Sequence, residues 1–157
     1  MNALIAWIAN YGLFAVAGLG AAAWLTWPRR QQLMVAVSAS VGGVIALALT
    51  KLAGALYYDP RPFVAQHMQP LIQHAPDNGF PSDHTVLAGL AAFIVLRYSR
   101  TMGLIMLAMT GLLGVARVAA RVHHPLDIVG ALVIAAVAAL AGGWLADTFW
   151  SGRDGMV

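Results

Sequence analysis

Long apolar stretches dominate this sequence and constrain its fold more than any other feature. About five of them, separated by polar connections, approach the roughly 20 residues that a helix needs to cross a bilayer. Hydrophobic residues make up 61% of the 157-residue chain and charged residues 10%, a balance far from that of soluble domains. The sequence therefore predicts an all-α fold, a polytopic transmembrane helical bundle of about five spans, with a single domain over residues 1–157.

The expected spans run from about residue 3 to 27, 33 to 57, 84 to 96, 101 to 120 and 127 to 150. No basic segment or small-residue cleavage site accompanies the first, so we expect a retained span rather than a removable signal peptide. The third is short, and we expect it to form a helical hairpin with the fourth. Between the second and third, one long polar loop of about residues 58–83 carries five prolines and three aspartates. A segment of this composition has no regular secondary structure to satisfy its backbone hydrogen bonds, so it cannot lie in contact with lipid.

The basic residues predict an orientation. Five spans put the first and third connections and the C-terminal tail on one side, with Arg29, Arg30, Arg97, Arg100 and Arg153. The opposite side receives the long loop and the last connection, with Lys51, Arg61, Arg117 and Arg121. If this second group serves a binding site, the first group alone sets the topology, and its side is cytoplasmic. The nine basic residues form no run or stripe, so we expect no nucleic acid partner.

Three polar clusters are expected at the outer end of the bundle. A charged group at a helix centre costs about 2.5–3.5 kcal/mol on insertion scales, so charges beside spans need a partner or a function. Taken singly, the clusters have ordinary interpretations: a snorkelling lysine before a proline turn, a helix N-cap, and a pair of interfacial arginines. The clusters are Lys51 with Asp59-Pro60-Arg61-Pro62-Phe63, then Gly79-Phe80-Pro81-Ser82-Asp83-His84-Thr85, and finally Arg117-Val118-Ala119-Ala120-Arg121-Val122-His123-His124-Pro125-Leu126-Asp127.

Taken together, the clusters supply the parts of a phosphate site. Ser82 or Asp83 is suited to cap a helix that begins near His84, and the free amides at a helix start bind anions. His123 and Asp127 are four residues apart, so in a helix the carboxylate would orient the imidazole. One shared function explains the three clusters more simply than three separate accidents. The sequence therefore predicts a site that binds a phosphoryl group and offers it histidine chemistry.

These residues resemble the type 2 phosphatidic acid phosphatase family, whose pattern is a Lys-to-Arg-Pro motif, a Pro-Ser-Gly-His motif and an Arg followed by His and Asp. Arg117, His123 and Asp127 reproduce the third motif's spacing. The second motif is matched with Asp83 in place of Gly, and nine residues rather than six separate Lys51 from Arg61. Ala116 stands where many members have Ser. The Phe-Pro-Ser-Asp-His-Thr form looks like the bacitracin-resistance-type undecaprenyl pyrophosphate phosphatases.

This resemblance implies a membrane lipid phosphatase of the bacterial cytoplasmic membrane, with its site on the outer face. It implies that undecaprenyl pyrophosphate is hydrolysed to the monophosphate through a phosphohistidine formed on His123. Asp127 would orient that imidazole, and His84 would act as acid and base. The phosphate would be bound by Lys51, Arg61, Ser82, Asp83 and Arg117. We expect no cofactor and no metal, because the sequence shows no cluster of carboxylates for magnesium.

Other interpretations remain open. The substrate class could instead be a glycerophospholipid phosphate, such as phosphatidylglycerol phosphate or phosphatidic acid. A non-enzymatic lipid transporter would favour polar residues along the spans, whereas here they gather at one end, and a structural membrane subunit is a third alternative. Histidines 67 and 74 could gate the site or contact substrate, but loop histidines are more often solvated, and the same is expected of aspartates 59 and 77. His124 is expected to be a bystander. The sequence leaves the oligomeric state open.

Overall fold

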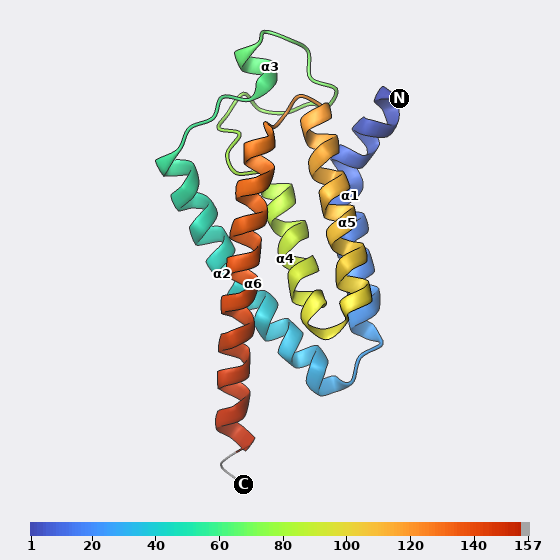
Figure 1. Cartoon of the computed structure of the whole chain (residues 1–157), viewed down its shortest axis with the longest axis vertical. Helices are drawn as coiled ribbons and strands as arrows, with labels where there is room; N and C mark the ends of the chain where they lie inside the picture. Colours follow the sequence, from blue (N-terminus) through green and yellow to red (C-terminus); the bar gives the residue numbers. More distant parts are fainter. Residues whose placement is uncertain (155–157) are drawn as a thin grey trace.

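Five long helices and one short helix make up most of this computed structural model, which describes residues 1–154, with side chains as far as residue 149. The predicted position of Arg153 on the cytoplasmic side concerns a side chain outside the described residues. The helices are α1 (Asn2–Leu25), α2 (Arg29–Leu56), α3 (Pro62–Ala65), α4 (Asp83–Tyr98), α5 (Arg100–Ala119) and α6 (Pro125–Asp154). Figure 1 shows the N-terminus, the long loop and the α5–α6 connection at one end, and the last turns of α6 at the other.

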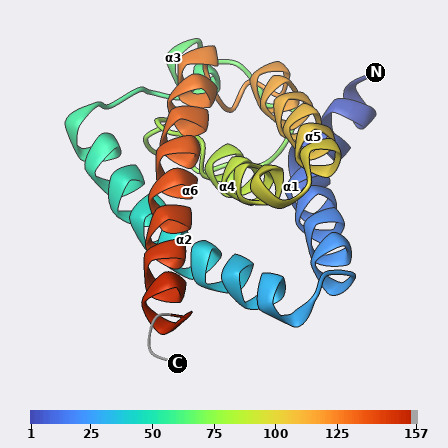
Figure 2. The same ribbon diagram turned by 60° about the horizontal axis from the view of Figure 1, so that its bottom comes forward.

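Four of the helices are long and apolar enough to cross a membrane: α1, α2, α5 and residues Pro125–Phe149 of α6. Helix α4 has 16 residues and is therefore about 24 Å long, short of the roughly 30 Å hydrocarbon core. It lies in the middle of the bundle, packed against α1, α2, α5 and α6 (Figure 2). The expected all-α helical bundle is confirmed, and so is the short third segment packed against the fourth. Instead of about five spans, four of the described helices meet the length and hydropathy of a span, because α4 is too short. The second helix begins at Arg29, earlier than expected, so both arginines lie in its first turn.

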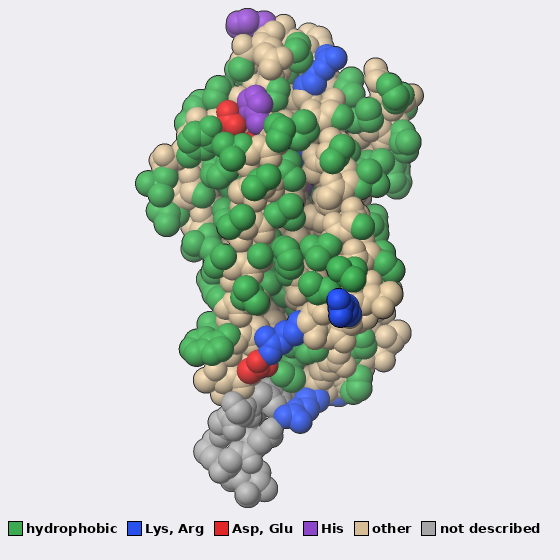
Figure 3. All heavy atoms as spheres, viewed as in Figure 1, with side chains coloured by type: hydrophobic (Ala, Val, Ile, Leu, Met, Phe, Trp, Pro, Cys, Tyr) green, Lys and Arg blue, Asp and Glu red, His purple; other side chains and the backbone are tan. Residues whose placement is uncertain are grey.

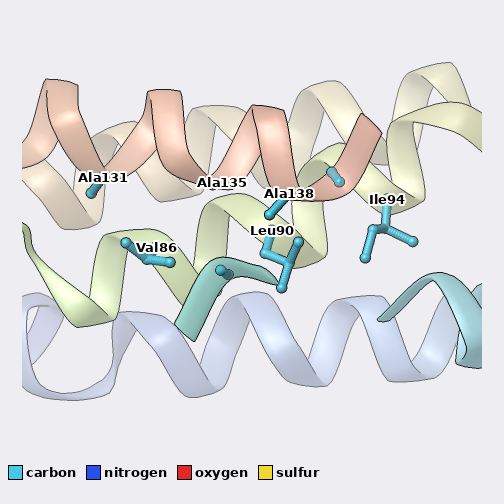
Figure 4. Close-up of a cluster of buried hydrophobic side chains, with 8 residues drawn as sticks. Val86, Leu90, Ile94, Ala131, Ala135 and Ala138 are labelled. Atoms are coloured by element: carbon cyan, nitrogen blue, oxygen red, sulfur yellow. The ribbon is translucent and has the colours of Figure 1, made fainter. Parts of the chain in front are cut away.

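Helix α4 is held by apolar contacts on two sides. One side carries Val86, Leu90 and Ile94, spaced four apart, which pack against a row of α6 alanines (Figure 4). Small alanine side chains let two helices approach closely within a membrane. The other side carries Ala88, Ala92 and Val95, which pack against α1 and α5. These contacts fix the position of the first turn of α4 relative to the end of α5 and the start of α6.

The surface of the bundle matches a lipid environment. Figure 3 shows charged and histidine side chains near the two ends of the visible face, with a largely hydrophobic band between them. Large apolar side chains such as Phe14, Val44 and Leu140 are 67–73% exposed on this band's helices. Contiguous exposed apolar surface of this kind marks contact with lipid or another apolar partner. The helices α1, α2, α5 and α6 thus suit a membrane protein.

One asparagine organises the long loop between α2 and α4. Asn78 Nδ2 donates hydrogen bonds to the carbonyl oxygens of Gly54 and Tyr57, at 2.9 and 3.0 Å, where α2 ends. Its Oδ1 accepts from the backbone N–H groups of Asp59 and Phe80, at 2.9 and 3.0 Å. The side chain therefore satisfies carbonyls that a helix end leaves without partners, and it ties both halves of the loop together.

Candidate functional site

The pair His123 and Asp127 forms the centre of the polar cluster at the loop end of the bundle. His123 Nδ1 lies 3.1 Å from Asp127 Oδ2, and the two side chains are 2% and 0% exposed. The expected contact is present, but the helix that was expected to produce it is not. His123 precedes α6, which begins at Pro125, and Arg121 reverses the chain after α5 with a φ of 67°. The backbone N–H of His124 also donates to Asp127 Oδ2, at 2.8 Å.

These contacts fix the state of the His123 ring. An ionised carboxylate accepts only, so Nδ1 carries the hydrogen and Nε2 carries the lone pair. Burial lowers the pKa of His123 below its ordinary value of 6.5, and Arg117 and Arg61 lower it further against the opposing hydrogen bond to Asp127. The ring is therefore neutral near pH 7, with an accepting lone pair on Nε2.

Two arginines approach that lone pair. Arg61 Nη1 and Arg117 Nη2 each lie 3.3 Å from His123 Nε2. Both residues are buried, with 5% and 2% exposure. Guanidinium groups bind phosphate oxygens through parallel hydrogen bonds, so two of them around one imidazole nitrogen make a site for a phosphoryl group.

Arg61 is held by partners on all three of its side-chain nitrogens. Its Nε donates to Asp77 Oδ1 at 2.8 Å, its Nη1 to the carbonyl oxygen of Val122 at 2.8 Å, and its Nη2 to that of Asn78 at 3.2 Å. Burial alone would raise the pKa of Asp77, but the hydrogen bond and charge of Arg61 hold it below its ordinary value. Asp77 is thus an ionised partner of the site, and the expectation that it is merely solvated is wrong.

Arg117 connects the site to the N-terminal helix and to the loop. Its Nη1 donates to the carbonyl oxygen of Ala9 in α1 at 3.2 Å, and its Nη2 lies 3.0 Å from His74 Nε2. His74 Nδ1 lies 3.4 Å from the Ala75 carbonyl oxygen, so Nδ1 donates there and Nε2 accepts from Arg117. Burial and the charges of Arg61 and Arg117 lower the pKa of His74, which keeps that ring neutral.

The start of α4 forms the floor of the site. Ser82 is the N-cap residue and is fully buried, but its side chain makes no capping bond; its Oγ accepts from Thr85 Oγ1 at 3.1 Å. Its backbone N–H donates to the carbonyl oxygen of Asp127 at 3.3 Å. His84 is the second residue of α4 and interacts electrostatically with Arg117, His123 and His74. The two expected catalytic histidines therefore lie at the same end of the bundle.

Lys51 lies apart from this cluster, whereas Asp83 lies beside it and interacts electrostatically with Arg117. Both line a pocket of about 260 Å³ between α2 and α4, together with apolar residues such as Leu47 and Leu87. Both side chains are exposed. Among the described residues, neither forms a hydrogen bond or ion pair with the residues around His123. Of the predicted site residues, the structure thus groups His84, Arg61, Arg117, His123, Asp127 and Ser82, and leaves two at the neighbouring pocket.

Sequence reasoning missed several contacts. His124 Nδ1 lies 3.0 Å from Asp59 Oδ2, so Asp59 is not simply a solvated loop residue. The expectation that the chain has no cluster of carboxylates is also wrong, because ligand-type atoms of Asp59, His124 and Asp127 lie within 4.8 Å of one another. A metal ion can use such a set. In this structure His124 Nδ1 contacts Asp59 Oδ2, and Asp127 Oδ2 accepts from the His124 backbone. The Asp-Asn-Gly turn at residues 77–79 was the available sequence signal for an ordered loop.

The chain is similar to known proteins over most of its length. Residues 33–150 match the PAP2 superfamily. The chain is 31% identical over 147 residues to the bacitracin transport permease protein BcrC of Bacillus licheniformis, covering 93% of this chain and 72% of that protein. It is 32% identical over 137 residues to the undecaprenyl-diphosphatase BcrC of Bacillus subtilis (strain 168), covering 87% and 70%.

Two solved structures share the fold. The crystal structure of Aquifex aeolicus LpxE superposes with a TM-score of 0.68 at 18% identity, over 90% of this chain and 84% of that one. A PAP2 type phosphatidylglycerolphosphate phosphatase from Bacillus subtilis gives a TM-score of 0.65 at 18% identity, over 94% and 77%.

Proposed function

This chain belongs to the PAP2 superfamily and is a membrane hydrolase that acts on a lipid phosphate, and from that premise we propose that its substrate is undecaprenyl pyrophosphate. Hydrolysis would yield the lipid monophosphate and inorganic phosphate. Support for this substrate comes from the Bacillus subtilis relative that is named an undecaprenyl-diphosphatase. Support for the chemistry comes from the site itself.

His123 is the proposed nucleophile. Its Nε2 lone pair attacks the terminal phosphorus, and the bond between that phosphorus and the bridging oxygen breaks. The imidazole becomes a phosphohistidine, whose positive charge Asp127 stabilises through the 3.1 Å contact at Nδ1. The observation that carries this proposal is the meeting of two buried guanidinium groups with Nε2, each at 3.3 Å, because they can bind the oxygens of a phosphorus placed for attack.

His84 is the proposed acid and base. It protonates the departing oxygen of the lipid phosphate, then takes a proton from the water that attacks the phosphohistidine. The N–P bond breaks, phosphate leaves, and His123 returns to its neutral form. Support for this role comes from the place of His84 in the first turn of α4, near Arg117 and His123. Burial, Arg117 and His123 lower the pKa of His84 to about 4, so the proton that it donates to the departing oxygen would be taken up when the negatively charged pyrophosphate binds.

Lys51 and Asp83, at their separate pocket, are proposed to contact the second phosphate or the adjoining part of the lipid. The pocket joins these two polar residues to an apolar wall from α2 and α4, which suits a molecule with a charged head and a hydrocarbon tail. Ser82 is proposed to offer its oxygen or the nearby backbone amides to phosphate. These three assignments carry over from the family resemblance.

We also propose that the protein resides in a bacterial cytoplasmic membrane with the site on the outer face. The support is the distribution of arginines, because Arg29, Arg97 and Arg100 lie at the end opposite to the loop. Short basic connections favour the cytoplasmic side.

The test is phosphate release by the purified protein in detergent with a chelator present. We expect undecaprenyl pyrophosphate to be hydrolysed faster than phosphatidylglycerol phosphate. His123→Ala should lower turnover by at least about 10³-fold, because the covalent route is lost. His67→Ala is the matched control, since that histidine is an exposed loop residue, and it should retain wild-type turnover.

A rapid quench at alkaline pH, where phosphohistidine persists, should show label from the terminal phosphate on the wild type and none on His123→Ala. Equal turnover by wild type and His123→Ala would remove His123 as nucleophile. Preference for phosphatidylglycerol phosphate would assign the protein to glycerophospholipid phosphates instead.

A further inference from the structure

Asp59 is a mostly buried carboxyl group that the proposed reaction does not use. It lies in the loop just after α2, and its side chain is 13% exposed. Its Oδ2 accepts a hydrogen bond from His124 Nδ1 at 3.0 Å. Two backbone bonds fix its position: its N–H donates to Asn78 Oδ1 at 2.9 Å, and its carbonyl oxygen accepts from Gly79 at 2.8 Å.

Asp127 has one oxygen that the other described residues leave without a donor. Its Oδ2 accepts from His123 Nδ1 and from the His124 backbone, whereas Oδ1 is buried and receives no hydrogen bond from a protein N–H or O–H group. A buried acceptor without a donor is costly to folding and rare in native structures. The carboxyl group of Asp59 lies close by, with a side-chain oxygen within 4.8 Å of one of Asp127.

Two ionised carboxylates close together repel each other. A hydrogen on one of them ends the repulsion and also supplies the donor that Asp127 Oδ1 lacks. We propose that Asp59 is a positioning residue that carries this hydrogen and donates it to Asp127 Oδ1. Asp127 is then held on both oxygens, by Asp59 on one and by His123 and His124 on the other. The role rests on the proposed function, because holding Asp127 matters through the orientation of His123.

The surroundings of Asp59 favour its protonated form. The charged or titratable groups that face it are Asp127 at the start of α6 and His124 in the α5–α6 connection. Burial and then Asp127 raise the pKa of Asp59 above its ordinary value, and His124 opposes them. Gly79 allows the close approach: a Cβ there would lie 3.1 Å from both Asp127 Oδ2 and the Asp59 carbonyl oxygen. The loop is therefore packed directly against the orienting carboxylate.

Asp59→Asn and Asp59→Ala separate this role from its alternatives. The amide introduced by Asp59→Asn would be an uncharged donor to Asp127 Oδ1 and an acceptor from His124, so this variant should keep kcat within about threefold. Asp59→Ala leaves Oδ1 without a donor and should lower kcat by roughly 10- to 100-fold with little change in KM, because the imidazole loses its alignment. Gln73→Ala, at an exposed residue of the same loop, is the control and should match wild type.

The pH dependence gives a second readout that a purely structural role would not produce. As pH rises, wild-type Asp59 loses its hydrogen and the two carboxylates repel, so kcat should fall on the alkaline side. Asp59→Asn cannot ionise, and this fall should disappear in that variant. Nitrogen NMR of His123 provides a readout independent of turnover: wild type and Asp59→Asn should keep the Nδ1–H tautomer, and Asp59→Ala should show a mixture.

Two results would overturn the proposal. If Asp59→Asn is as slow as Asp59→Ala, the hydrogen on Asp59 has no role. If wild type binds a stoichiometric transition metal that Asp59→Asn loses, the three residues hold a metal ion instead. Failure of the proposed substrate would appear differently, as an inactive wild type with the NMR differences among the variants intact.

Discussion

His123 shows how a short sequence motif acquires its chemistry only in the folded chain. Burial and two arginines favour the neutral ring, while Asp127 fixes which nitrogen carries the hydrogen. The Arg–His–Asp spacing was legible in the sequence, and it predicted the contact between His123 and Asp127. It did not predict the backbone path, because a proline at residue 125 and a left-handed residue at 121 place His123 outside any helix.

The state of His123 leads to a prediction at the residue scale. Because its folded pKa lies below 6.5, the ring should stay neutral as pH falls through 6.5 and gain a proton only at lower pH. Nitrogen NMR of the free enzyme in detergent, assigned with His123→Gln, measures this directly. A His123 midpoint at or above 6.5 would contradict a neutral nucleophile.

Residues that act through the long loop escaped sequence reasoning for a physical reason. His74 and Asp77 look like solvated loop residues, and nothing in their neighbours along the chain indicates otherwise. They become site residues because the loop folds back over the ends of α5 and α6, which brings His74 to Arg117 and Asp77 to Arg61. These two contacts join residues that are 16 and 43 positions apart in the sequence, so they depend on the path of the loop and not on a local sequence pattern.

At the scale of elements, the loop is as well defined as the helices it joins. Five prolines restrict its backbone, and Asn78 ties its two halves to the last turn of α2. The sequence predicted the loop's boundaries and its place at the site, but it predicted irregular chain and missed the Asn78 bonds. Helix lengths were the easier part, since hydropathy marks where the apolar stretches end.

Asn78→Ala tests the loop as an element. Four hydrogen bonds are lost, two of them to carbonyls at the end of α2, so the variant should be less stable by about 2–4 kcal/mol and should melt at lower temperature in detergent. Turnover should fall as well, because the backbone at residue 78, whose carbonyl oxygen accepts from Arg61, is no longer held in place by the side chain. Asn78→Asp keeps the accepting oxygen and loses the two donated bonds, so its melting temperature should be intermediate. Wild-type stability for the alanine variant would show that the loop is held by other contacts.

At the scale of the whole molecule, the bundle places every clustered site residue at one end, and the orientation of that end in a cell stays a prediction. So does the single-domain organisation. Hydropathy predicted the bundle well because lipid-facing helices must be apolar throughout. It could not show how deeply α4 lies, since a short buried helix and a short span have the same composition.

The orientation can be tested with single cysteines, because the natural chain has none. Gln73→Cys lies in the exposed loop and should react with a membrane-impermeant maleimide in intact bacterial cells. Thr101→Cys, exposed at the start of α5 at the other end, should react only after the cells are permeabilised. The reverse pattern would put the site on the cytoplasmic face and contradict the proposed localisation.

The convergence of Arg61 and Arg117 on one ring nitrogen has a consequence for the thermal behaviour of the protein. Two buried cations held close together oppose folding, and an anion lodged between them relieves their repulsion. Occupancy and heat resistance are therefore linked: orthophosphate, vanadate or a bisphosphonate should each raise the melting temperature according to its affinity. Melting curves alone can then rank inhibitors of this protein, with no lipid in the assay.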